Sequence, residues 1–269
     1  MTPRYVDAHC HVQFDPYDAD REVLIERMRE EGVVGIVVGT DLASSQNALA
    51  LAEKHDHLFA SAGLHPNYTE EVFSPESYAS LLQNTRMVAV GECGLDYFRP
   101  SEVNDEVKKK QQDLFEEHVE LAVSVNKPLI IHSRPSKGTM DAYTDLISIL
   151  KSKKKEYGDR LKGDVHFFVG GVEEAREIYA LDFTTSFTAV ITFTHEYDEV
   201  IRFAPLASIL SETDAPYVAP ASRRGTRNDP LAVIEVVEII AKIRNGERED
   251  IRAALVQNAS RLFALPPRL

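Results

Sequence analysis

The stretch Tyr5-Val6-Asp7-Ala8-His9-Cys10-His11 contains the two features on which the fold prediction depends. It is a short, β-rich apolar run, and it ends in two histidines at alternate positions. Side chains alternate faces along a strand, so His9 and His11 point the same way and Cys10 points into the core on the other face. Two imidazoles in this arrangement can chelate one cation. Taken alone, however, a His-x-His motif is more often a pair of packed histidines.

Similar runs recur along the chain and alternate with amphipathic stretches. After Tyr5–Val12, the predicted strands are Val33–Gly39, Leu58–Gly63, Met87–Gly91, Pro128–His132, Asp164–Phe168, Phe183–Ala189 and Ala207–Ser211. The predicted helices are Asp20–Glu31, Ser44–His55, Val107–Val125, Asp141–Tyr157 and Val172–Ala180, with two more over Pro230–Leu265 that break near Asn245-Gly246. Eight such units in about 250 residues favour a closed (β/α)8 barrel, the TIM barrel of the α/β class, over an open sheet. We expect residues 1–269 to form one domain.

Composition is that of a globular protein with a real core. Of the 269 residues, 43% are hydrophobic and 27% are charged, and the formal net charge is −13. Disorder and a membrane-spanning segment are not expected, and the acidic balance disfavours a protein that coats nucleic acid. Cys10 and Cys93 are the only cysteines. Without a disulfide framework or a secretion signal, the sequence predicts a cytoplasmic protein.

Ionisable residues mark the ends of several predicted strands. Glu92 follows the fourth strand, His132 ends the fifth, His166 lies in the sixth, and Asp214 follows the eighth. Barrel enzymes carry their active sites at the carboxyl ends of the strands. Together with the two histidines of the first strand, these residues predict a metal site on one rim, because unpaired polar groups are costly to bury by chance.

These segments resemble the TatD family of metal-dependent hydrolases, and the resemblance covers nearly the whole chain. The matching segments are Asp7–His11, Gly63-Leu64-His65-Pro66, Val90–Tyr97, Pro128–Arg134, His166–Gly170, Glu212–Pro216 and Arg227-Asn228-Asp229-Pro230. One departure is Val169, where the family usually has a small polar residue. The resemblance implies a barrel of the amidohydrolase type and divalent-metal hydrolysis, often 3′-5′ exonuclease action on DNA or RNA.

The resemblance also implies a set of metal ligands. His9, His11 and Asp214 would bind one ion, and Glu92 would bridge to a second ion held by His132 and His166. Such a pair of Mg, Mn or Zn ions activates a water for phosphoryl transfer. Asp214, as the acceptor of the water's proton, and Glu92 are therefore the predicted catalytic residues.

Other polar residues near the predicted rim have less specific interpretations. His65 and Arg134 are predicted to bind the substrate phosphate, for which a guanidinium is well suited. Asp96 either orients a ligand imidazole or caps its loop. The segment Arg223–Arg227 either meets a polyanion or forms salt bridges on the surface. The lysine run Lys151–Lys155 is interpreted as a solvated helix end.

Three function classes are compatible with this site. The favoured one is a 3′-5′ exonuclease (deoxyribonuclease) with nucleic acid as its partner and no membrane association. The alternative is a metal-dependent amide or ester hydrolase, such as an aminoacyl-tRNA deacylase, because the same metals polarise a carbonyl. A non-catalytic binding protein is disfavoured by the presence of all six ligands. The sequence leaves the oligomeric state open, and a monomer is compatible with it.

Overall fold

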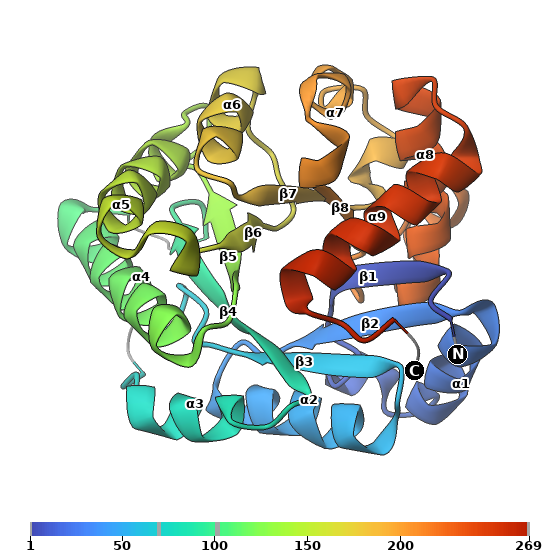
Figure 1. The fold of residues 1–269 in the computed structure, drawn as a ribbon, viewed down its shortest axis with the longest axis horizontal. Helices are drawn as coiled ribbons and strands as arrows, with labels where there is room; N and C mark the ends of the chain where they lie inside the picture. Colours follow the sequence, from blue (N-terminus) through green and yellow to red (C-terminus); the bar gives the residue numbers. More distant parts are fainter. Residues whose placement is uncertain (1, 69–70, 100–102, 268–269) are drawn as a thin grey trace.

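Eight parallel strands form the centre of the molecule in the computed structural model, which describes residues 2–68, 71–99 and 103–267. The strands pair in chain order, and the helices lie outside them (Figure 1). Their bounds are β1 Tyr5–Cys10, β2 Val33–Val38, β3 Leu58–Ala62, β4 Met87–Asp96, β5 Leu129–Arg134, β6 Gly163–Val165, β7 Thr184–Phe187 and β8 Ile209–Ser211. The predicted (β/α)8 architecture is confirmed.

The sheet closes where the chain following β8 meets β1. A parallel bridge joins Cys10 to Ala215, and the N–H of His11 donates to the Ala215 carbonyl at 2.8 Å. The N–H of Asp214 donates in turn to the His9 carbonyl at 2.9 Å. Within the part of the chain that the structure describes, closure leaves no free sheet edge, and it brings residues some 200 positions apart into contact.

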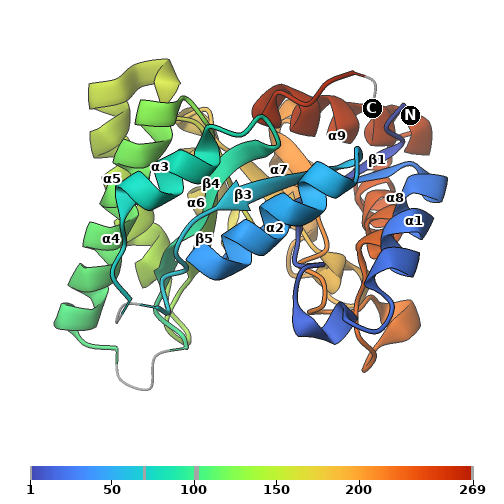
Figure 2. The ribbon, with the colours of Figure 1, turned by 90° about the horizontal axis from the view of Figure 1, so that it is seen from below.

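The helices surround the barrel (Figure 2), and several begin at recognisable caps. Their bounds are α1 Arg21–Glu31, α2 Leu42–Lys54, α3 Pro75–Leu82, α4 Asp105–Val125, α5 Asp141–Tyr157, α6 Val172–Ala180, α7 Asp198–Phe203, α8 Val233–Arg244 and α9 Arg248–Phe263. The sequence prediction missed α3 and α7, which are short. It also began α2 two residues late, since the side chain of Asp41 caps that helix by accepting the Ser44 N–H at 2.7 Å.

Two apolar cores stabilise the barrel. One lies between the strands and the surrounding helices and contains Cys10, as predicted. The other fills the barrel with inward-facing residues such as Ile36 and Ile130, and it is covered at the amino-terminal end of the strands by Leu262 and Phe263 of α9. The last helix therefore plugs the end of the barrel opposite the predicted site.

The strand β4 is longer than predicted. It was expected to end at Gly91, with Asp96 on a loop, but its pairing with β5 continues as far as Asp96 beside Arg134. The backbone of β5 supplies the hydrogen bonds that extend it. Asp96 is thus the last residue of a strand and is completely buried.

The two basic segments lie on the surface. Within Arg223–Arg227, Arg223 pairs with Asp229 and Arg227 pairs with Asp20, both at 2.6 Å, which favours the salt-bridged interpretation. The lysine run lies near the C-terminal end of α5, in agreement with its interpretation as a helix end. Within it, Lys153 forms an ion pair with Glu120 at 2.7 Å. Among the described residues, no helix is both long and apolar enough to cross a bilayer.

Replacing Phe263, which covers the amino-terminal end of the barrel, is expected to destabilise the protein. The ring is 2% exposed, so Phe263→Ala leaves a cavity and should lower the free energy of unfolding by about 3–5 kcal/mol. Chemical denaturation measures this loss. Gln257→Ala, at an exposed position of the same helix, is the control and should change stability little. Equal stability of the two variants would show that α9 does not support the core.

Candidate active site

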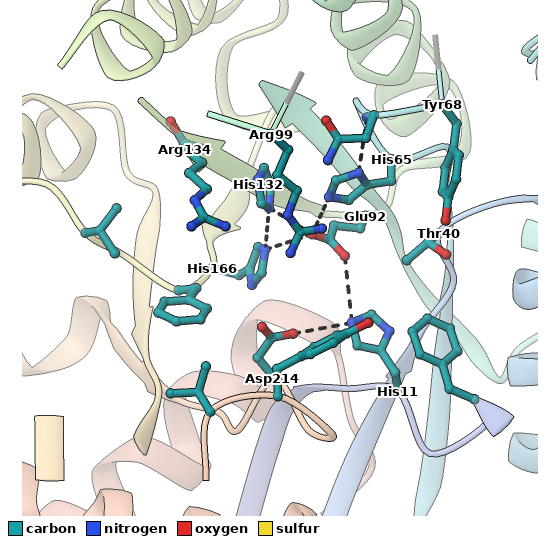
Figure 3. Close-up of a pocket in the computed structure, with 17 residues that line it drawn as sticks. His11, Thr40, His65, Tyr68, Glu92, Arg99, His132, Arg134, His166 and Asp214 are labelled. Atoms are coloured by element: carbon teal, nitrogen blue, oxygen red, sulfur yellow. Dashed lines mark hydrogen bonds and ion pairs between the residues drawn. The ribbon is translucent and has the colours of Figure 1, made fainter. Parts of the chain in front are cut away.

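The structure brings the six predicted metal ligands together at the carboxyl end of the barrel. His9, Glu92 and His132 lie within strands, whereas His11, His166 and Asp214 lie one to three residues beyond the ends of β1, β6 and β8. Five of the six line one pocket of about 500 Å³ (Figure 3). His9 is not part of the pocket wall and is completely buried. The pocket is large enough for a nucleotide-sized ligand.

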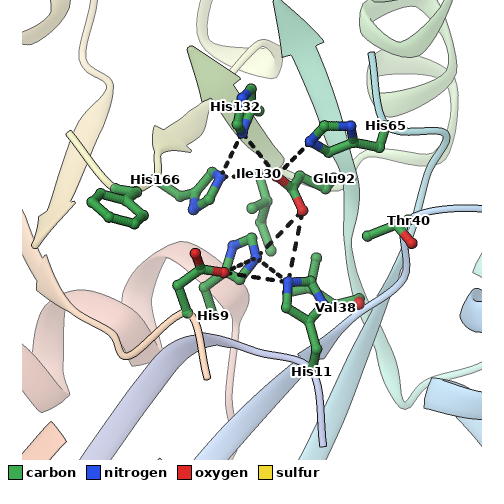
Figure 4. A network of polar contacts seen from close by, with 12 residues as sticks. His9, His11, Val38, Thr40, His65, Glu92, Ile130, His132 and His166 are labelled. Carbon is green, nitrogen blue, oxygen red and sulfur yellow. Dashed lines mark hydrogen bonds and ion pairs between the residues drawn. The ribbon is translucent and has the colours of Figure 1, made fainter. Parts of the chain in front are cut away.

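The carboxylate of Glu92 lies between two groups of imidazoles (Figure 4). Its Oε1 is 3.0 Å from Nδ1 of His132 and 3.0 Å from Nε2 of His166. Its Oε2 faces the other way, 3.5 Å from Nε2 of His9 and 3.8 Å from Nε2 of His11. Each oxygen can therefore serve a different cation, as a bridging carboxylate does.

The first group of donor atoms comes from the two segments that close the barrel, namely the end of β1 and the turn after β8. Nε2 of His9 and Nε2 of His11 are 3.0 Å apart, and Oδ1 of Asp214 lies 3.7 and 3.4 Å from them. Asp214 adopts a positive φ of 52°, which an aspartate tolerates better than most residues and which belongs to the turn after β8. Three donor atoms thus converge on one point.

The second group comes from neighbouring strands. Nδ1 of His132 and Nε2 of His166 are 3.3 Å apart, and both face the same oxygen of Glu92. In addition, the rings of His9 and His166 stack at 3.9 Å between centroids. Burial, together with the neighbouring His166, lowers the pKa of His9, which favours a neutral His9 ring with a free lone pair.

Hydrogen bonds from outside the cluster orient three of the imidazoles. Nδ1 of His11 donates to the Val38 carbonyl at 2.8 Å, and Nε2 of His132 faces Oδ2 of Asp96 at 3.2 Å. Nδ1 of His166 faces Glu212 at 3.5 Å. Each contact leaves the other ring nitrogen as an acceptor directed into the cluster, as in metal sites. The donor set therefore fits divalent cations.

Asp96 has both of the roles that the sequence left open. Its Oδ1 accepts the N–H groups of Phe98 and Arg99, each at 2.9 Å, which caps the following loop. Its Oδ2 faces His132. Although burial disfavours its charge, the hydrogen bond with His132 and the two backbone bonds outweigh that effect and hold the pKa of Asp96 well below its usual range.

Two glycines of the Gly91–Gly94 segment allow the close approach of β4 to β5. A Cβ at Gly91 would lie 2.5 Å from the Ile130 carbonyl oxygen, and one at Gly94 would lie 2.1 Å from that of His132. Both residues also have positive φ values, 144° and 131°, which favour glycine. The glycines therefore place Glu92 directly beside His132.

His65 lies next to Glu92, but its hydrogen bonding differs from that of the other imidazoles. Its Nδ1 accepts the Asn67 N–H at 3.2 Å, so a neutral ring carries its hydrogen on Nε2, which lies 3.3 Å from Oε1 of Glu92. Burial lowers the pKa of His65 and keeps the ring neutral. His65 is thus arranged as a hydrogen-bond donor rather than as a metal ligand, although its Nε2 is close enough to the cluster to bind a cation.

Glu92 remains ionised despite its burial. Burial raises the pKa of this carboxyl, but the imidazoles that face it, with hydrogen bonds from His132 and His166, hold it well below its usual range. An acidic group that stays ionised at the centre of a buried cluster attracts cations. The electrostatics therefore agree with the geometry of the donor atoms.

Arg134 lines the pocket, as does Arg99, which the sequence interpretation missed (Figure 3). The Arg134 guanidinium packs over the Phe98 ring at 4.1 Å, and none of the described carboxylates lies within ion-pair distance of it. Arg99 lies 3.8 Å from Asp96 and is half exposed. Its position three residues after Asp96 was the only sequence signal that could have identified it.

Aromatic side chains form much of the remaining wall. Sequence reasoning did not select any of them, because aromatic residues in a barrel sequence are usually core residues. The aromatic residues that line the pocket are Phe14, Tyr68, Phe167 and Tyr217.

Comparison with known proteins gives a consistent result. Residues 6–264 match the family model described as TatD related DNase. The chain is 35% identical to the uncharacterized metal-dependent hydrolase YabD of Bacillus subtilis, over 96% of this chain and 98% of that protein. Both comparisons agree with the resemblance noted in the sequence.

Solved structures share the fold. The crystal structure of YJJV, a TatD homolog from Escherichia coli K12, superimposes with a TM-score of 0.87 at 32% identity, covering 99% of this chain and 100% of that one. A hydrolase TatD family protein from Entamoeba histolytica gives 0.81 at 21% identity, over 98% and 99% of the two chains, and supports the fold alone.

Removing the carboxylate behind His132 is expected to weaken metal binding. Asp96→Asn keeps the size of the side chain but loses the charge that orients the imidazole, so divalent-metal affinity should fall about 10- to 100-fold. Competition with a chelator measures this affinity. Asp56→Asn, at an exposed aspartate paired with Arg86, is the control. Unchanged affinity in Asp96→Asn would contradict the orienting role.

Proposed function

This chain belongs to the TatD-related DNase family of metal-dependent hydrolases, and we propose that it is a 3′-5′ exonuclease that hydrolyses phosphodiester bonds of DNA or RNA. The observation that carries the proposal is the position of Glu92. Its two oxygens face separate groups of ligands at the floor of a pocket that also contains two arginines. Paired cations beside guanidinium groups suit a phosphodiester.

The residues would hold two divalent cations, Mg, Mn or Zn. His9, His11 and Asp214 would bind one, His132 and His166 the other, and Glu92 would bridge them. When bound, the cations polarise a phosphoryl oxygen and lower the pKa of water. Four imidazoles suit Zn or Mn, whereas a phosphodiester substrate favours Mg.

Asp214 is the proposed proton acceptor. Burial raises the pKa of this carboxyl. The hydrogen bond with His11 and the nearby imidazoles lower the pKa by more than burial raises it, so the group is ionised at neutral pH. It lies in the pocket wall, where a carboxylate can take a proton from an attacking water.

His65 and Arg134 are the proposed phosphate ligands, with Arg99 beside them. The Nε2–H of His65 can donate to a phosphoryl oxygen without a change of protonation. Arg134 presents a guanidinium with no described carboxylate to compete for it, and it is held in place by Phe98. The two guanidinium groups supply positive charge where the polyanion would bind, on a chain whose net charge is −13.

We further propose that the whole chain acts as one domain in the cytoplasm. Barrel closure joins β1 to the segment after β8, and α9 covers the opposite end, so the described chain contributes to one barrel from end to end. Cys10 and Cys93 are both free, buried thiols, which suits a reducing compartment.

Glu92→Ala is expected to abolish hydrolysis without unfolding the protein. The variant loses the bridging carboxylate, whereas both apolar cores are unchanged. The assay incubates metal-loaded protein with labelled single-stranded DNA, RNA or aminoacyl-tRNA, with EDTA as the metal-free condition. Cleavage of aminoacyl-tRNA alone would favour the deacylase alternative.

Two further measurements accompany the Glu92→Ala assay. Glu117→Ala, at an exposed glutamate of α4, should retain full activity. Circular dichroism and metal analysis separate a lost metal from a lost fold. A fully metallated, fully active Glu92→Ala would show that Glu92 is not the bridge.

Arg134→Lys tests phosphate binding. Lysine cannot form the two-pronged contact of a guanidinium, and losing one charge-assisted bond of about 1.5–3 kcal/mol should lower kcat/KM about ten- to a hundredfold. The activity of the wild type should also fall steeply as salt increases.

Arg223→Lys is the matched control for Arg134→Lys. Its guanidinium is paired with Asp229 outside the pocket, so the change should have little effect on cleavage. Salt-insensitive turnover, together with a neutral Arg134→Lys, would argue against a phosphodiester substrate.

A further inference from the structure

Tyr217 is an exposed aromatic residue at the mouth of the metal-ligand pocket. It lines the pocket, and 46% of its side chain is exposed, although it lies only three residues after Asp214. Its ring is nearly perpendicular to that of His11, at 72° and 6.3 Å between centroids, so it does not stack on this ligand. Within the described residues, its hydroxyl makes no hydrogen bond. The ring therefore has no evident role in holding the fold together.

The turn that carries Tyr217 is held firmly. Its own N–H donates to the Asp214 carbonyl at 2.9 Å. Asn228 is completely buried and bonds to the turn on both sides of the ring. Its side-chain Nδ2 donates to the carbonyl of Thr213 at 3.2 Å and to the carbonyl of Val218 at 3.3 Å. Its backbone N–H donates to the carbonyl of Pro216 at 3.1 Å. The Arg227–Pro230 motif of the sequence thus has a structural explanation.

The backbone conformation of the turn also indicates that the surrounding structure enforces its shape. Val218 has a φ of 51°, a region that β-branched residues rarely adopt. Such a conformation persists where the surroundings enforce it, most often at ligand sites. An exposed ring on a strained turn clamped by a buried asparagine is preorganised to receive a ligand.

We infer that Tyr217 is a stacking platform for a nucleobase next to the scissile phosphate. This inference rests on the proposed phosphodiesterase function and adds the position of the base. A base presents a flat π-face, and stacking on an exposed tyrosine tolerates any base, as an exonuclease requires. Arg99 and Arg134 lie on the other side of the pocket from His11 and Asp214 (Figure 3). Phosphate would face these cations, and the base would face the Tyr217 turn.

The test compares Tyr217 variants on substrates that differ by one base. Three oligonucleotides are used: one intact, one abasic at the 3′-terminal nucleotide and one abasic at its neighbour. The wild type should cleave the intact strand with a kcat/KM about tenfold or more above that for one of the abasic strands. Tyr217→Ala should lose this preference, whereas Tyr217→Phe, which keeps the ring, should retain it. Phe203→Ala, at an exposed ring of α7 outside the pocket, is the control.

Each possible result either supports the stacking inference or overturns it. Loss of the base preference in Tyr217→Ala alone, with unchanged metal content, supports the platform and identifies the stacked base. A preference that survives Tyr217→Ala overturns it. Equal losses in Tyr217→Ala and Tyr217→Phe on all three strands also overturn it, because they indicate a hydroxyl or metal effect. Failure of the wild type to cleave any strand would instead remove the phosphodiesterase function, and the stacking inference with it.

Discussion

The carboxylate of Glu92 is the group on which the rest of the site depends. It is only 4% exposed, and a buried carboxylate costs several kcal/mol unless opposite charge compensates it. Five imidazoles face its two oxygens, those of His9, His11, His65, His132 and His166, but a neutral imidazole supplies no net charge. The missing charge is what divalent cations provide. An acidic protein can in this way build a positive centre at one place without a basic surface.

A second layer of buried polar groups keeps these imidazoles in position. Glu212 faces His166 and also accepts the Ser186 hydroxyl at 2.7 Å. Ser186 contacts Asp164 as well, and burial raises the pKa of Asp164 to about 7. Asp7 likewise bonds to Thr213, next to Asp214, at 2.6 Å. Partnered polar groups of this kind rigidify a site, since each would be costly if it lost its partner.

The pocket above the metal ligands combines two kinds of surface. Arg99 and Arg134 bring charge, and Tyr68 and Tyr217 bring exposed rings. All four lie on loops or at strand ends, which can vary without disturbing the barrel. The metal-ligand cluster thus suits the class of chemistry, metal-dependent hydrolysis, whereas these rim residues are the ones that we propose to contact the substrate. Likeness in the fold alone, as to the Entamoeba histolytica hydrolase, does not extend to them.

The sequence by itself determined the alternation of strands and helices and pointed to the six candidate metal ligands, because periodicity and the histidines and carboxylates at strand ends are local signals. Local signals did not reveal the extension of β4 to Asp96 or the place of Arg99 in the pocket wall. Those features depend on contacts between segments far apart in the chain. Barrel closure brings Asp214 to His9, and the hydrogen bonds of Asn228 help to hold the turn of Tyr217 at the pocket mouth. A hydrogen bond between distant residues produces no periodic pattern in the sequence. These long-range contacts were therefore decided by the tertiary structure alone.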